Sequence, residues 1–304
     1  MKLSIIIPIY NVEKYVNGTL SSIYDQGADE GQFEVIVVND GTPDNSMAIV
    51  ETFADVHSNL VIINQENQGL SAARNTGMRV AKGDYIWVVD SDDSITENSI
   101  GQALEQIIRH PDVEMFCFDL NDRVSSSMFS VHDGYFFCRK LPTGIAQRFL
   151  FSKRFLQKYE LEFTPGIYHE DQDFLIRCYT KAQRVLPLRR IWYNYNIRES
   201  GSITSTFKMK RFHDILWIIK NFRKLSESSS GYKEITILEE GVFSLSYGLL
   251  TSSYRSHPEY RAFLDDNKKE LKSLLWSSYY KSIRKNSLGK TYRLVKSILY
   301  ILYR

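Results

Sequence analysis

Three carboxylates stand within four residues of one another directly after an apolar run, and their spacing suits a cation. Tyr85 to Val89 is continuous and β-prone, as in a strand that is buried on both faces. Asp90, Asp92 and Asp93 follow it. Hard carboxylate oxygens prefer Mg²⁺ or Mn²⁺ to softer metals, so the cluster can hold either ion. The alternative is a solvated turn that caps the next helix, because Asp is a good N-cap residue.

The segments that must position these carboxylates alternate between apolar runs and amphipathic stretches. This alternation predicts an α/β fold whose mostly parallel sheet is wound by right-handed crossovers and flanked by helices. In such sheets ligands bind beyond the carboxyl ends of the strands, and polar residues follow the first, second and fourth runs. The predicted strands are residues 3–9, 33–38, 60–63, 85–89, 113–118 and 189–195, and the predicted helices include 13–26, 71–81, 97–109 and 145–159.

The pattern changes beyond Ser205, where long amphipathic helices replace the alternation. Breaks are expected at Ser226 to Gly231 and at His257-Pro258, because Ser, Gly and Pro interrupt helices. We therefore predict two parts. Residues 1–205 form a domain built on the sheet, and residues 206–304 form a helical C-terminal region.

The composition indicates an ordinary globular chain. The 304 residues are 43% hydrophobic and 24% charged, with a formal net charge of +2. The three cysteines, Cys117, Cys138 and Cys178, are odd in number and lack CxxC spacing, which argues for reduced thiols and against a zinc site. No run approaches the ~18 apolar residues of a membrane span. We expect a cytoplasmic protein in which residues 3–9 form a strand and not a signal peptide.

Four stretches together resemble family 2 glycosyltransferases of the GT-A fold, the nucleotide-sugar-dependent enzymes of bacterial capsule and lipopolysaccharide assembly. The resemblance extends from Ser4 to about Ser205. Each stretch alone is a weak signal, but four in this order and spacing are specific. They are Ser4–Asn11, Val37–Asp44, Asn67–Gly77 and Ala81–Asp93, the last of which carries the DxD motif.

The resemblance implies a Rossmann-like GT-A domain whose first three stretches contact the nucleotide. It assigns Pro8, Tyr10 and Asn11 to the turn after the first strand, where a flat aromatic ring and a polar edge can hold a nucleobase. It makes Asp40 the nucleotide contact, which can accept hydrogen bonds from a uracil N–H or a ribose hydroxyl. It also implies that Arg74 would stack on the nucleotide or bond to it. For the segment around Asp40, a plain turn followed by an N-cap is the alternative.

The fourth stretch supplies the metal site in this comparison. The resemblance implies that Asp92 would hold the divalent ion, Mn²⁺ or Mg²⁺, against both phosphates and so stabilise the departing nucleoside diphosphate. Asp90 lies two residues earlier on the same side of an extended chain. It therefore suits the ribose, or the metal and its water shell.

A Glu-Asp pair begins a helix beneath the acceptor site in the family, and it corresponds here to Glu170 and Asp171. The resemblance makes Asp171 the general base, with Glu170 orienting it or contacting the acceptor. Taken without the resemblance, Glu170, Asp171 and Asp173 form an acidic first turn that complements the dipole of a helix through Cys178.

A later segment, Tyr193 to Thr204, resembles the part of the family in which a basic residue reaches the diphosphate. Arg198 is the candidate for this contact, and Ser202 is a second. Family members with a His in this segment use it as an extra metal ligand, and this chain has none there. It also lacks the Gln-x-x-Arg-Trp motif of processive synthases, so we expect addition of a single sugar.

Residues 281–304 contain seven basic residues and no acidic ones. An apolar stripe at helical spacing comprises Leu288, Tyr292, Val295, Leu299 and Leu302. This pattern is typical of a helix on an anionic bilayer, which predicts a peripheral position on the inner face of the cytoplasmic membrane. The alternative is packing against the domain or another subunit of a homo-oligomer. Nucleic-acid binding is not expected, because no recognition motif accompanies the basic tail.

The resulting hypothesis is an inverting, metal-dependent glycosyltransferase. It moves one sugar from a nucleotide-sugar, with a UDP-sugar favoured, to a hydroxyl of a glycan or lipid-linked acceptor. The rival hypothesis is a non-catalytic nucleotide-sugar-binding scaffold of a polysaccharide assembly complex, against which Asp90, Asp92 and Asp171 argue. A nucleotidyltransferase is disfavoured because the chain lacks a Gly-rich, Lys-containing phosphate loop.

Overall fold

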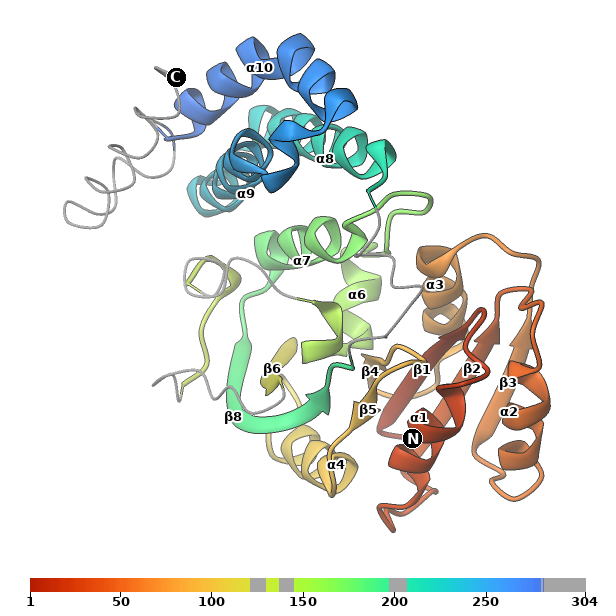
Figure 1. The fold of residues 1–304 in the computed structure, drawn as a ribbon. Helices are drawn as coiled ribbons and strands as arrows, with labels where there is room; N and C mark the ends of the chain where they lie inside the picture. The colour runs from red at the N-terminus through yellow and green to blue at the C-terminus, as the bar shows by residue number, and fades with distance from the viewer. Residues whose placement is uncertain (121–129, 137–144, 197–206, 280, 282–304) are drawn as a thin grey trace.

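A computed structural model describes residues 1–120, 130–136, 145–196, 207–279 and 281. Within these residues eight strands form one sheet in the order β3-β2-β1-β4-β7-β6-β8-β5 (Figure 1). The strands are β1 (Leu3–Ile9), β2 (Phe33–Asn39), β3 (Leu60–Asn64), β4 (Tyr85–Val88), β5 (Ser94–Ile95), β6 (Met115–Leu120), β7 (Phe149–Ser152) and β8 (Val185–Asn194). The helices that accompany them are α1 (Val16–Tyr24), α2 (Ser46–Ala54), α3 (Leu70–Val80), α4 (Ser99–Arg109), α6 (Lys153–Lys158) and α7 (Glu170–Lys181).

The two faces of the sheet carry different helices, because successive residues of a strand point to opposite faces. Ile5 and Ile7 of β1 belong to an apolar cluster with α1, α2 and α4. Ile6 belongs to the cluster on the other face, with α3, α6 and α7. Strands β1 to β4 pair in parallel. The predicted parallel sheet and its crossover helices are confirmed in this half, and the carboxyl ends of β1, β2 and β4 meet at one edge.

Residues 145–159 are not the single helix that the sequence predicted. They form the 3-10 turn η1 (Ala146–Arg148), β7 and α6. β7 pairs antiparallel with β4 and with β6. Its run Phe149-Leu150-Phe151 is buried, and so short an apolar run fits a buried strand as well as a helix. The sheet therefore joins its parallel half to antiparallel pairs that the sequence did not predict, and β8 begins earlier than expected.

Three long helices follow, α8 (Met209–Ser228), α9 (Tyr232–Thr251) and α10 (Pro258–Ser278), with the short η2 (Ser253–Ser256) before the last. Their breaks fall where Ser, Gly and Pro predicted them. They lie together on the side of the molecule that carries α7, and α9 packs against α7 (Figure 1). The apolar cluster on that side runs from Ile6 through Phe174 of α7 to Phe222 of α8 and Leu275 of α10. None of the described helices is both long enough and apolar enough to cross a membrane.

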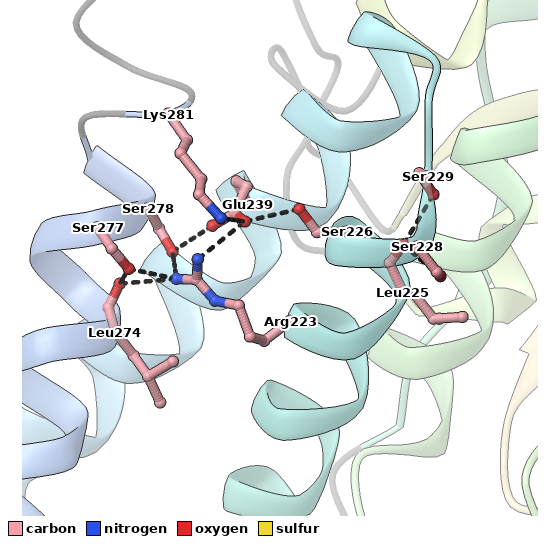
Figure 2. A network of polar contacts seen from close by, with 10 residues as sticks. All are labelled: Arg223, Leu225, Ser226, Ser228, Ser229, Glu239, Leu274, Ser277, Ser278 and Lys281. Carbon is pink, nitrogen blue, oxygen red and sulfur yellow. Dashed lines mark hydrogen bonds and ion pairs between the residues drawn. The ribbon is translucent and has the colours of Figure 1, made fainter.

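A buried carboxylate joins the three C-terminal helices (Figure 2). Glu239 of α9 is fully buried, and its Oε1 lies 2.6 Å from Ser226 Oγ and 3.1 Å from Arg223 Nη1, both on α8. Its Oε2 accepts a hydrogen bond from Ser278 Oγ of α10 at 2.6 Å, and Lys281 Nζ lies 3.2 Å from Oε1. A buried charge is costly unless it is paired and hydrogen-bonded, and both oxygens of Glu239 have such partners here.

Candidate active site

The acidic cluster lies where β4 ends. Asp90, Asp92 and Asp93 each offer a carboxylate oxygen, and these oxygens lie within 4.8 Å of one another. Like charges this close repel unless a cation lies between them, and hard oxygens are the ligands of Mn²⁺ and Mg²⁺. Asp90 and Asp92 are half-buried, whereas Asp93 is buried. The residues present therefore fit the predicted divalent ion.

Asp93 is held in place by the end of β8. Tyr193 donates its hydroxyl to Oδ2 at 2.6 Å, and the Asn196 backbone N–H donates to Oδ1 at 2.7 Å. Burial raises the pKa of Asp93 to about 7, and these two hydrogen bonds oppose the rise. The Tyr193 hydroxyl also accepts a hydrogen bond from the Asp90 N–H at 3.2 Å. One tyrosine therefore fixes both ends of the acidic cluster.

Asp90 binds protein groups with both carboxylate oxygens. Gln147 Nε2 donates to Oδ2 at 2.6 Å, and Arg74 Nη2 donates to Oδ1 at 2.7 Å. Gln147 is buried in η1, and its backbone carbonyl accepts a hydrogen bond from the indole N–H of Trp87. Each carboxylate oxygen carries a second lone pair, which leaves capacity for a ribose hydroxyl or a metal-bound water.

Arg74 connects the acidic cluster to the acids of α7. Its side chain is 1% exposed. Besides Asp90, it donates from Nη1 to Glu170 Oε1 at 3.1 Å and to Asp171 Oδ1 at 3.0 Å. The guanidinium also lies over the Phe163 ring, 5.0 Å from its centre. A single buried cation therefore holds carboxylates from two segments that are far apart in sequence.

Asp171 stands in the first turn of α7 between Glu170 and Asp173. The side chains of Glu170 and Asp171 are each 16% exposed. Burial raises the pKa of Asp171 to about 7 against the opposing charge of Arg74, and Glu170 and Asp90 add to the rise. A carboxylate whose pKa is near neutrality can both take and release a proton. The acidic first turn is present as predicted, and two of its acids also reach Arg74.

The residues predicted to contact the nucleobase lie around the end of β1. Tyr10 is 50% exposed, and Asn11 has a left-handed backbone with a φ of 55°. Pro8 does not lie on the turn, as the sequence had suggested, because β1 continues to Ile9 and buries it opposite Val38. Of the three predicted residues, Tyr10 and Asn11 therefore lie on the turn.

Asp40 is buried and holds the loop that leads into α3. Its Oδ1 accepts from Gln65 Nε2 at 2.7 Å and from the Gln68 N–H at 2.8 Å, and its Oδ2 accepts from the Gly69 N–H at 2.8 Å. α3 carries Arg74. Asp40 thus supports the segment that positions the central guanidinium.

A cleft of about 350 Å³ opens beside the acidic cluster. Its walls come from the start of α1, the acidic cluster and the end of β8, and Lys14 contributes a positive charge to the lining. The lining residues are Lys14, Tyr15, Gly18, Thr19, Asp92, Asp93, Ser94 and Asn196.

Sequence reasoning missed several residues of this site. Gln147 gave no signal because residues 145–159 were predicted as one helix. Phe163 lay outside every motif. Tyr193 and Asn196 were within a segment that resembles the family, but nothing there indicated a bond to Asp93. Arg198 and Ser202 lie outside the described residues, as do residues 282–304 of the basic tail.

Residues 4–166 match the model of the family described as Glycosyl transferase family 2. The match covers more than half of the chain and includes the acidic cluster. The chain therefore belongs to glycosyl transferase family 2.

Individual proteins agree with this assignment. The chain is similar to "Glycosyltransferase GlyA" of Streptococcus pneumoniae, with 31% identity over 71% of this chain, and it spans 33% of GlyA. The structure of S. aureus TarS 1-349 in complex with UDP-GlcNAc matches with a TM-score of 0.73 and 23% identity, over 93% of this chain and 88% of that one. The mannosyltransferase PcManGT from Pyrobaculum calidifontis, in complex with GDP-Man and Mn²⁺, matches with a TM-score of 0.56 and 15% identity, over 94% and 88%. These structures establish the GT-A fold.

Proposed function

We propose that the chain is an inverting, metal-dependent glycosyltransferase that moves one sugar from a UDP-sugar to a hydroxyl of a glycan or lipid-linked acceptor in cell-surface polysaccharide synthesis. The observation that carries this proposal is the shared guanidinium of Arg74. It bonds Asp90 of the acidic cluster and Asp171 of α7 at once. A donor-binding carboxylate and a candidate base are therefore held next to each other by one rigid group, as a single displacement requires.

The donor half of the proposal rests on the acidic cluster. Asp92 and Asp90 are the residues that would hold Mn²⁺ or Mg²⁺, and the Tyr193 hydroxyl links the Asp93 carboxylate to the backbone N–H of Asp90. The ion, when bound, neutralises charge on the departing diphosphate. Two fold relatives support a nucleotide-sugar donor, since TarS was solved with UDP-GlcNAc and PcManGT with GDP-Man and Mn²⁺.

The acceptor half rests on Asp171. As its carboxylate accepts the proton of an acceptor hydroxyl, the oxygen attacks the anomeric carbon in line with the departing phosphate, which inverts the configuration. The raised pKa of Asp171 suits this task, because a general base works best when its pKa lies near the operating pH. Glu170 and Arg74 hold the carboxylate in position.

The decisive experiment is isothermal calorimetry with UDP, with and without Mn²⁺, together with a panel of UDP-sugars tested for metal-dependent UDP release. The wild type should bind UDP more tightly when Mn²⁺ is present. Asp92→Ala should abolish that difference and lower UDP release by orders of magnitude, because the diphosphate would then face uncompensated carboxylates. Equal UDP affinity of the wild type in both conditions would rule out the metal bridge.

A further inference from the structure

The loop that leads to Asp171 depends on residues outside its own helix. Residues 166–169, the base loop, immediately precede Glu170 and Asp171. Gly166 has a φ of 74°, and His169, the N-cap of α7, has a φ of 63° and makes no side-chain capping hydrogen bond. A left-handed non-glycine residue is strained, so its conformation has to be imposed by surrounding contacts.

The start of α8 and its N-cap contact the base loop at Gly166 and Tyr168. Asp214 Oδ2 accepts a hydrogen bond from the Tyr168 backbone N–H at 2.8 Å. Lys210 Nζ donates to the Gly166 carbonyl at 2.7 Å and to Asp214 Oδ2 at 2.6 Å. The ammonium groups of Lys208 and Lys210 also lie over the Tyr168 ring, 5.7 and 5.5 Å from its centre.

Asp214 is well placed to determine the position of the base loop. Its side chain is only 12% exposed, so the hydrogen bond from Tyr168 is shielded from water. The segment just before the loop is anchored separately, since Asp173 Oδ2 accepts from Thr164 Oγ1 at 2.7 Å and from Arg177 Nη2 at 2.7 Å. The loop is therefore held from α7 on one side and from α8 on the other.

We propose that Asp214, with Lys210, is a positioning residue for the general base: it fixes the base loop and through it the direction of Asp171. Asp214 lies beyond residues 4–166, which match the family model. The proposal rests on the proposed function, in which Asp171 is the base. It assigns a role in the reaction to the C-terminal helical region.

The test uses the full chain, the UDP-sugar that gives the fastest Mn²⁺-dependent UDP release, and water as the acceptor. Asp214→Ala should lower the release rate by about 10-fold or more, since small misplacements of reacting groups have effects of this size. Its affinity for UDP with Mn²⁺ should stay within about 2-fold, because a residue that acts on the base leaves donor binding alone. Asp214→Asn keeps an oxygen for the Tyr168 N–H and should restore most of the rate.

A double-mutant cycle separates positioning from general damage to the fold. In the Asp171→Asn background, Asp214→Ala should cause no further loss, because its effect passes through the missing base. Lys220→Ala is the matched control. Lys220 lies on α8, as Asp214 does, and its exposed ion pair is with Glu270 of α10, so the substitution should leave release unchanged. If Asp214→Ala does not fold, Lys210→Ala serves in the same cycle, with a smaller loss expected.

The outcomes distinguish this inference from the proposed function. Normal release by Asp214→Ala, or an equal loss in both backgrounds, overturns the positioning role and leaves the function standing. Release at the wild-type rate by Asp171→Asn overturns the base assignment and this inference with it.

Discussion

At the scale of single residues, the site is organised around one buried cation. Arg74 is bonded to Asp90, Glu170 and Asp171, and each of these carboxylates would repel the others without it. The DxD motif and the Glu-Asp pair could be picked out from the sequence through the family resemblance, because alone each also fits a turn or an acidic first turn of a helix. The bonds of Arg74 could not, because its partners on α7 are brought to it only by the tertiary fold.

A direct test of the base is Asp171→Asn, which keeps size and hydrogen bonding but cannot take a proton. We expect UDP-sugar affinity within a few-fold of the wild type and UDP release reduced by about 10²-fold or more, the usual scale for a positioned base. Glu170→Gln should do less damage, because its proposed role is orientation. The measurement is UDP release, with nucleotide affinity determined on the same preparations. Normal turnover by Asp171→Asn would move the base elsewhere.

The pH dependence of turnover follows from the same carboxylate. Only the ionised form of Asp171 accepts a proton, and burial raises its pKa to about 7, so the rate should increase as the pH rises through that value. Glu170→Gln removes a negative charge that contributes to the raised pKa. Its pH–rate profile should therefore be displaced to lower pH. Superimposable profiles for the wild type and Glu170→Gln would show that the charge of Glu170 does not affect the pKa of Asp171.

At the scale of elements, periodicity predicted the parallel half of the sheet, where buried strands alternate with crossover helices. β1, β2, β3, β4 and their crossover helices were predicted with small boundary errors. Residues 145–159 were predicted as a helix because they contain too few apolar residues to distinguish the periodicity of a helix from that of a strand. What makes β7 a strand is its place between β4 and β6, which are distant in sequence. Because of that error, Gln147 was not recognised as a hydrogen-bond donor to Asp90.

The C-terminal helices offer a test of stability at this scale. Glu239→Ala removes the partner of Arg223, whose side chain is 11% exposed, and leaves a buried charge unpaired (Figure 2). The expected loss is about 3–5 kcal/mol of the free energy of unfolding. Glu270→Ala breaks an ion pair whose members are about half exposed and should cost about 1 kcal/mol or less. Urea unfolding of both variants measures the difference, and equal small shifts would show that the network contributes little.

At the scale of the whole molecule, the sequence anticipated a change of character beyond Ser205 but not the shared core. Composition alone cannot indicate that one apolar cluster continues from the sheet through α7 into α8 and α10. The contact between Asp214 and the base loop was equally invisible, because it joins the two predicted parts. The helical region therefore contacts the loop that precedes the candidate base.

The basic tail, residues 281–304, leads to a prediction about membrane binding by the whole molecule, and this prediction comes from the sequence. Deleting the residues after Asn286 removes four of the seven basic residues, Lys290, Arg293, Lys296 and Arg304. Binding to anionic vesicles should weaken, since each basic residue contributes about 1 kcal/mol near a charged surface. Release of UDP in solution should be unchanged. Vesicle sedimentation measures the first effect, and loss of folding or of an oligomer after truncation would favour the packing alternative.

The shared core also determines when the nascent chain can finish folding during its synthesis on the ribosome. Ile176 of α7 lies close to Gly241 of α9, and the cluster around it is completed only by the last helices. Synthesis of residues 209–278 takes on the order of ten seconds. During that interval a nascent chain with a paired sheet presents an uncovered apolar face, a surface that chaperones bind. Yield in a cell should therefore depend on how quickly translation delivers α8 to α10.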